Sequence, residues 1–222
     1  MKKISDDLVF SLHSLPDGFL YSHLIKQSEG KAKVGFKMVS FEKGVVTKVT
    51  KNIFMLAKFG ANYKFFADKI KNYITCFGHP FDDGRTLVIE TDGSGVVYDE
   101  NGDELWSESF IYSDKTPTCA AVNDTTLWIC YKELNTIVKY DLKMLRQELR
   151  IGGVNAPFKK PCGLFPAGTK LFVCSEENKS VLKLDCITYQ TENYFEYEEV
   201  IKDYKFINKY EILVTESGIY ML

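Results

Sequence analysis

The sequence lacks the features that mark membrane, secreted and redox-active proteins. No apolar run in the 222 residues reaches the roughly 18–20 residues that cross a bilayer. Asp6 and Asp7 stand where the apolar core of a signal peptide would lie, so we expect no signal peptide. The six cysteines form no Cys-x-x-Cys pair, which argues against a zinc ribbon or a thioredoxin-type site. We therefore expect free thiols in a reducing compartment and predict a cytoplasmic location.

Signals for catalysis and for nucleic-acid binding are equally scarce. Gly-x-Ser-x-Gly does not occur, there are three histidines, and no helix follows the Gly-Ser-Gly turn at residues 93–95 to bind a phosphate. The 28 basic and 30 acidic residues leave a net charge of −2, which gives no support to non-specific binding of nucleic acid. We expect neither a nucleic-acid partner nor a membrane partner, and the oligomeric state stays open.

The chain does contain a repeat of 43 residues. Cys76, Cys119 and Cys162 are spaced at this interval, and an apolar strand, a polar turn and two further strands follow each of them. The second strands of the repeat are expected at residues 86–90, 126–130 and 170–174. A repeat of about 40–45 residues made of short strands is typical of a β-propeller blade. The sequence thus predicts an all-β fold, with Cys76, Cys119 and Cys162 at equivalent positions on adjacent inner strands.

The repeat predicts one β-propeller domain over residues 1–222 with five blades of four antiparallel strands. Three complete blades are expected at residues 72–112, 114–153 and 158–198. The tail holds only three strands, and residues 8–12 are the expected fourth. Closure by strands from both ends of the chain would remove free sheet edges.

The remaining blade fits the template least well. Its strands are expected at residues 19–25, 33–41, 45–50 and 53–59. Residues 60–71 form a longer connection that could hold a helical turn. If they hold another pair of strands, six blades are possible.

The fourth predicted unit resembles the NHL/SMP-30/YVTN group of propellers. Those families show Pro-x-Gly-Leu, then Gly-x-Leu-Tyr-Val, then Asn-x-x-Ile/Val; here these are Pro161-Cys-Gly-Leu, Gly168-Thr-Lys-Leu-Phe-Val and Asn178-Lys-Ser-Val. The resemblance covers about residues 114–216. It implies a propeller that binds RNA or protein, or that acts as a metal-dependent lactonase. The acidic residue that usually follows the second strand is replaced by Thr91, Tyr131 or Ser175, and the paired Gly-His and Trp-Asp signatures of WD40 blades are absent.

The resemblance also implies a binding face formed by the loops at one end of the blades. The candidate residues on this face are polar or charged side chains in the predicted turns: Asp92, Lys115, Glu133, Asn135, Lys159, Lys160, Glu176, Glu177, Asn178, Lys202 and Glu216. They could bind a polar partner or a divalent ion. Ordinary solvated turns explain the same residue types, and we favour that interpretation.

Two further groups of residues have both a chemical and a structural explanation. Three thiolates from Cys76, Cys119 and Cys162 could hold a soft metal, but packing of small apolar side chains where strands crowd together is the favoured explanation. His79, expected in a turn at residues 77–84, could act as a base with Asp82 or Asp83, although a Pro- and Gly-containing turn is a sufficient account. No catalytic residue is assigned.

Two functions follow from this sequence. The first is a non-catalytic scaffold that binds a protein partner through one face and needs no cofactor. The alternative is a divalent-metal hydrolase of the SMP-30/gluconolactonase kind, with an ion such as calcium at the channel mouth. The oxygen ligands of that ion would come from Glu90, Asn135 or Asn178, and Asp92 or Asp203.

Overall fold

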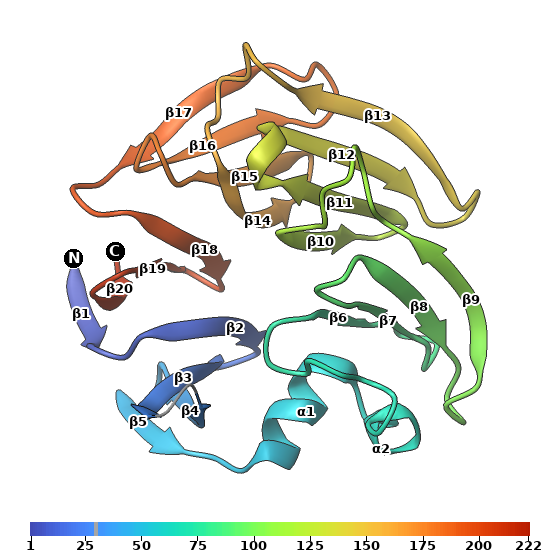
Figure 1. The fold of residues 1–222 in the computed structure, drawn as a ribbon. Helices are drawn as coiled ribbons and strands as arrows, with labels where there is room; N and C mark the ends of the chain where they lie inside the picture. Colours follow the sequence, from blue (N-terminus) through green and yellow to red (C-terminus); the bar gives the residue numbers. More distant parts are fainter. Residues whose placement is uncertain (29–30) are drawn as a thin grey trace. The chain divides into compact units, whose positions relative to one another are not determined.

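A computed structural model describes residues 1–28 and 31–222, and these contain five antiparallel sheets of four strands each. In Figure 1 the strands are coloured along the chain, from blue at the N-terminus to red at the C-terminus. These sheets confirm the predicted all-β architecture of five blades with four strands. The contacts between residues divide the chain into two compact units, which are described separately: unit 1 comprises residues 1–4, 111–206 and 211–222, and unit 2 comprises residues 5–110 and 207–210. The prediction of a single domain stays a prediction.

Unit 1 holds three sheets, and the first two of them follow the 43-residue repeat closely. The first consists of β10 (Cys119–Asn123), β11 (Thr126–Tyr131), β12 (Thr136–Asp141) and β13 (Arg146–Gly152). The second consists of β14 (Pro161–Ala167), β15 (Lys170–Ser175), β16 (Ser180–Asp185) and β17 (Thr191–Glu196). The repeated apolar residues Leu127 and Leu171 lie on the second strands and are fully buried. Burial on both faces explains why these strands read as continuous apolar runs.

The third sheet of unit 1 combines strands from both ends of the chain. It contains β18 (Ile201–Ile207), β19 (Tyr210–Thr215), β20 (Gly218–Met221) and β1 (Lys2–Ser5). Figure 1 shows β1, in blue, beside the red β20. The prediction of a blade shared by the two ends is confirmed, but the predicted donor, residues 8–12, is wrong. Those residues lie in β2 (Val9–Leu15), the first strand of a different sheet.

Unit 2 begins with the sheet for which the sequence-based assignment was wrong. Its strands are β2, β3 (Gly18–Ser28), β4 (Lys31–Ser40) and β5 (Val45–Lys48). The predicted strands at residues 19–25, 33–41 and 45–50 exist. They are the second, third and fourth strands of the sheet, whereas the first, second and third were expected. Because β2 takes the first place in the sheet, no fourth strand is needed from residues 53–59.

Residues 53–59 form a helix rather than the predicted strand. Helix α1 (Lys51–Phe59) begins after Thr50, whose hydroxyl accepts a hydrogen bond from the Ile53 amide at 3.4 Å. Phe54, Met55 and Phe59 are buried at the i, i+1 and i+5 spacing of one helical face. The short helix α2 (Tyr63–Phe66) follows, which confirms the expected helical turn in residues 60–71.

The last sheet of unit 2 starts one residue after the first repeated cysteine. It consists of β6 (Phe77–Pro80), β7 (Thr86–Ile89), β8 (Ser94–Tyr98) and β9 (Glu104–Ser109). Cys76 therefore precedes its strand, whereas Cys119 begins β10 and Cys162 is the second residue of β14. His79 lies within β6, paired with Leu87, and not in the predicted turn.

A polar cluster around Asp7 anchors the segment that links β1 to β2. Lys37 on β4 donates to both Asp7 oxygens at 2.9 and 2.7 Å, and the Tyr21 hydroxyl donates to Oδ2 at 2.7 Å. Ser5 also donates to Asp7, and His23 Nδ1 lies 3.3 Å from Oδ1. Partial burial raises the pKa of Asp7, but these donors outweigh it and bring the pKa down to about 2.

Replacing Asp7 with asparagine should lower the free energy of unfolding by about 2 kcal/mol at pH 7. Because the folded-state pKa lies below that of the unfolded chain, the stabilisation is present above pH 3.8 and is lost as the pH falls toward 2. Urea unfolding of the Asp7→Asn protein should lack this acid-dependent loss. Asp17→Asn, which changes an exposed carboxylate, should behave like the wild type. An equal acid response in the two variants would contradict the assignment.

Candidate functional site

The predicted binding-face residues of unit 1 come together as a chain of alternating charges. Glu176, directly after β15, lies with Oε2 2.6 Å from Lys132 Nζ and 3.6 Å from Lys202 Nζ. Lys202, on β18, also lies 3.3 Å from Glu216 Oε1. Residues from three blades of unit 1 thus meet at one carboxylate. We call Lys132, Glu176, Lys202 and Glu216 the ion-paired rim.

Local turn geometry positions the side chains of the rim. Lys132 begins the 3-10 turn η1 (Lys132–Leu134), which ends at Asn135 in the left-handed region with φ 48°. Asparagine tolerates this conformation because its short polar side chain can hydrogen-bond to nearby backbone. Asn135 Oδ1 accepts a hydrogen bond from the Lys160 amide at 2.7 Å, which ties the turn after β11 to the segment before β14.

The remaining predicted residues of unit 1 lie around this rim in smaller pairs. Lys115 and Glu133 form an ion pair at 2.6 Å, and Lys160 and Glu177 form one at 3.6 Å. The Ser175 hydroxyl accepts a hydrogen bond from the Lys159 amide at 2.8 Å and donates to the Lys159 carbonyl at 2.9 Å. Exposed pairs such as these add little to stability. Their effect is to hold the charged groups in fixed places.

Asn178 and Asp92 complete the predicted set. Asn178 Nδ2 donates to the Pro157 carbonyl at 3.0 Å within unit 1. Asp92 lies in unit 2, where it accepts hydrogen bonds from the amide and hydroxyl of Ser94 at 2.9 and 2.6 Å. These bonds lower the pKa of Asp92, and Lys71 Nζ lies 3.6 Å from its carboxylate. Hydrogen bonds within its own turn therefore fix the position of the Asp92 side chain.

Burial and neighbouring positive charges shift the pKa of Glu176 in opposite directions. Its side chain is only 20% exposed, and this burial raises its pKa. The hydrogen bond from Lys132 and the charge of Lys202 outweigh burial, so the pKa lies below the usual value for glutamate. Glu176 therefore carries its charge at neutral pH and holds both lysines.

Sequence analysis missed Lys132, which contributes the shortest contact of the rim. Lys132 stands five residues after Leu127, just as Asp92 follows Leu87 and Glu176 follows Leu171. An alignment of the repeats on these leucines would have found it. The opposite charges of Lys132 and Glu176 at equivalent positions concealed the relationship.

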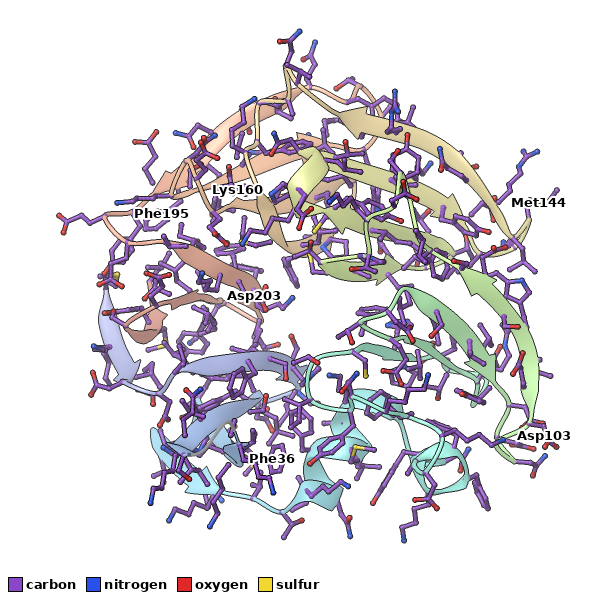
Figure 2. All side chains as sticks on the ribbon, in the orientation of Figure 1. Phe36, Asp103, Met144, Lys160, Phe195 and Asp203 are labelled. Carbon is purple, nitrogen blue, oxygen red and sulfur yellow. The ribbon has the colours of Figure 1, made fainter. Side chains whose placement is uncertain are left out.

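The residues offered as ligands for a divalent ion have partners within their own units. The Glu90 carboxylate in unit 2 accepts hydrogen bonds from the amides of Lys71 and Asn72 at 2.7 and 3.3 Å. Asp203 on β18 (labelled in Figure 2) lies 3.2 Å from Lys205 Nζ, and burial raises its pKa. Across residues 1–28 and 31–222, no three His, Cys, Asp or Glu side chains come together as a potential metal site.

The repeated cysteines pack against apolar clusters. Cys76 is 3% exposed and belongs to the cluster of Met55, Phe59 and Phe66, and burial raises its pKa to about 11. The Cys162 thiol donates to the Ile201 carbonyl at 3.1 Å. All six cysteines are free thiols. Burial raises the pKa of Cys76, Cys119 and Cys162 and so disfavours the thiolate, which is the form that binds metal.

His79 lies between aromatic side chains. Burial lowers its pKa, although the charge of Asp82 acts in the opposite direction, and its ring stacks on Phe77 and meets Phe81 edge to face. Asp83, one of the two proposed partners, instead forms an ion pair with Arg85 at 2.7 Å. The histidine is part of an aromatic row.

Comparison with known proteins identifies the fold and leaves the family open. No family model and no curated protein match the sequence. The WD40 β-propeller domain of Doa1 aligns with a TM-score of 0.56 and 11% identity, over 96% of this chain and 62% of that one. The chain has the β-propeller fold.

Two other solved structures support the same conclusion. The RRP9 WD40 repeats align with a TM-score of 0.51 and 15% identity, over 64% of this propeller and 48% of that chain. The computationally designed Ika4 protein aligns with a TM-score of 0.50 and 12% identity, over 64% of this chain and 87% of that one. The propeller spans between about half and two thirds of the natural WD40 chains. Identities this low show the fold alone. In the described part of the chain, no helix has the length and apolar character to span a membrane.

Proposed function

We propose that this propeller is a non-catalytic scaffold that binds a protein partner through the ion-paired rim. The observation that carries the proposal is the convergence of Lys132, Glu176 and Lys202, from three blades, on one surface of unit 1. Because neighbouring charges already hold these side chains, binding would cost less conformational entropy than it would for free lysines and glutamates. Complementary charge patterns across an interface increase specificity and speed association.

A further observation favours binding over catalysis. The side chains offered as metal ligands are held by structural partners or lie in apolar clusters, and His79 lies between aromatic side chains. The WD40 propellers similar to this chain, such as the RRP9 repeats, share its fold. Membership of the NHL/SMP-30/YVTN group, a cytoplasmic location and independence of a cofactor belong to the same proposal and stay predictions.

Reversing the charge of Glu176 should weaken binding of the partner by about tenfold or more. Glu176→Lys places a third positive charge beside Lys132 and Lys202, which both lose their shared anion. Proteins captured from native cell extract by wild type and variant can be compared by quantitative mass spectrometry. The affinity of any differing protein is then measured by calorimetry with purified components.

The matched control is Glu148→Lys on the outer strand β13, which breaks the ion pair between Glu148 and Lys139 of β12 and leaves the rim intact. It should retain the partner. A partner that binds both variants equally would exclude the rim as its site. Metal-dependent turnover of a lactone by the purified protein would support the hydrolase instead.

A further inference from the structure

The near-neutral net charge of the chain conceals a basic segment in unit 2. Residues 21–60 contain eight lysines, two glutamates, and no arginine or aspartate. The rest of the chain holds 20 basic and 28 acidic residues. The sheet β2–β5 and helix α1, which contain the segment, therefore carry a strong local positive charge that the total of −2 does not reveal.

The strand register collects five of these lysines on one face of the sheet. Lys31, Lys33 and Lys37 alternate along β4 and so point to the same side. Lys26 on β3 pairs directly with Lys33, and Lys48 on β5 pairs directly with Lys37. Directly paired residues share a face of the sheet. We call Lys26, Lys31, Lys33, Lys37 and Lys48 the lysine face.

Among the described residues, most of the lysines of the lysine face have no acidic partner. Lys37 is held by Asp7, whereas Lys26, Lys31, Lys33 and Lys48 are exposed. Among residues 1–28 and 31–222, no acidic side chain lies within ion-pair distance of these four. Like charges directly opposite each other destabilise a sheet. The arrangement costs stability, and a bound anionic partner would relieve that cost.

The open edge of the same sheet offers backbone groups beside these lysines. Strand β5 ends the sheet order β2-β3-β4-β5. The Val49 amide donates to the Phe36 carbonyl of β4 at 3.0 Å. Hydrogen-bonded pairs alternate along antiparallel strands, so the backbone N–H and C=O groups of Thr47 and Val45 also face β4. Those of Val46 and Lys48 face outward, away from β4.

The side chains of β5 are as accessible as its outward backbone groups. All four residues of the strand are exposed, and Val46 pairs with Val39, which places it on the same side as Lys48. A strand added to β5 would thus find an apolar side chain and a lysine at adjacent positions of the lysine face.

We propose that β5 binds an extended acidic segment of another protein as a fifth strand, with its carboxylates on the lysine face. Main-chain hydrogen bonds to Val46 and Lys48 would supply affinity, and alternating carboxylates would supply specificity. Nucleic acid and anionic lipid could meet the lysines, but their phosphates have no donors for the outward C=O groups. The site lies in unit 2 and does not depend on the ion-paired rim.

The test uses a short fluorescent peptide in which glutamate alternates with valine, measured by fluorescence anisotropy with the full-length protein. Binding should weaken about tenfold or more in Lys33→Glu/Lys48→Glu. Val46→Pro removes one outward N–H and leaves the bonds to β4 in place, so it should also weaken binding about tenfold. Melting temperatures establish that the variants are folded.

The control Lys64→Glu/Lys143→Glu makes the same change in net charge on exposed lysines outside the lysine face, and it should bind the peptide like the wild type. Glu176→Lys should also bind normally, which separates this site from the proposed function of the rim. Absence of peptide binding, an equal loss in the control, or unchanged binding by Val46→Pro would overturn the proposal. So would tighter binding of oligouridine RNA or phosphatidylserine vesicles than of the peptide.

Discussion

Replacing Trp128 with alanine should lower the free energy of unfolding by about 4 kcal/mol, the largest effect we expect from a single substitution. Trp128 on β11 is 2% exposed and lies in the core of unit 1 with Phe158, Leu164 and Leu171. Truncation removes the apolar contacts of the indole and leaves a cavity, because rigid sheets on both sides relax only in part. Urea unfolding followed by far-ultraviolet circular dichroism measures the loss.

Trp106, the other tryptophan of the chain, is the matched control. It lies on β9, the last strand of its sheet, and is half-buried. Trp106→Ala removes the same side chain from an incompletely buried position and should cost about 1 kcal/mol. Equal losses in the two variants would contradict the proposal that complete burial between strands makes Trp128 important.

Replacing Lys58 with methionine should raise the free energy of unfolding by about 2 kcal/mol at pH 7. Lys58 is 1% exposed in α1, where its ammonium group donates to the Ile74 carbonyl at 2.9 Å. Burial lowers its pKa to about 8, although the neighbouring Cys76 and Glu90 act in the opposite direction. The pKa difference from the unfolded chain corresponds to a cost of about 3 kcal/mol. Methionine removes that cost and loses one hydrogen bond worth about 1 kcal/mol.

The pH dependence separates this electrostatic cost from packing. A lysine with a lowered pKa in the folded state destabilises the protein below pH 8, and this cost disappears as the pH rises from 8 to 10.5. The advantage of Lys58→Met should therefore shrink across that range. Cys76 is present in both proteins, and because burial raises its pKa to about 11, its thiol stays mostly protonated in the folded state across that range. Lys64→Met, at an exposed position of α2, should show no such trend. A pH-independent advantage of Lys58→Met would overturn the explanation.

The three blades with the 43-residue interval could be predicted because their signals are local. Alternating burial, turn residues and strand endings are repeated at the same spacing, and β10–β17 follow them closely. The first blade lacks the repeated cysteine and strand ending. Its segment 53–59 is apolar at positions that suit a strand or a helix. Packing of α1 against β3 and β6 decided between them.

For the binding-face residues too, local sequence patterns predict positions along the chain but not contacts between distant segments. Turn chemistry predicted where Glu176, Lys202 and Glu216 would lie along the chain. Their ion pairs depend on which blades are neighbours, and no local pattern states that. The lysine face was missed for a related reason, since a total charge averages over the chain whereas strand register concentrates like charges on one side.

The repeat length, the four strands of a blade and the mixing of both ends in one sheet follow from local patterns in the amino-acid sequence. That β1, and not residues 8–12, completes the sheet of β18–β20 follows from the folded arrangement. The physical reason is that strand alternation and turns depend on neighbours along the chain, whereas pairing between opposite ends depends on which candidate edge strand leaves the fewest unpaired groups. Residues 8–12 could serve as an edge strand equally well by their pattern. The core of unit 2 uses them as part of β2 instead, with Leu12 buried beside β3.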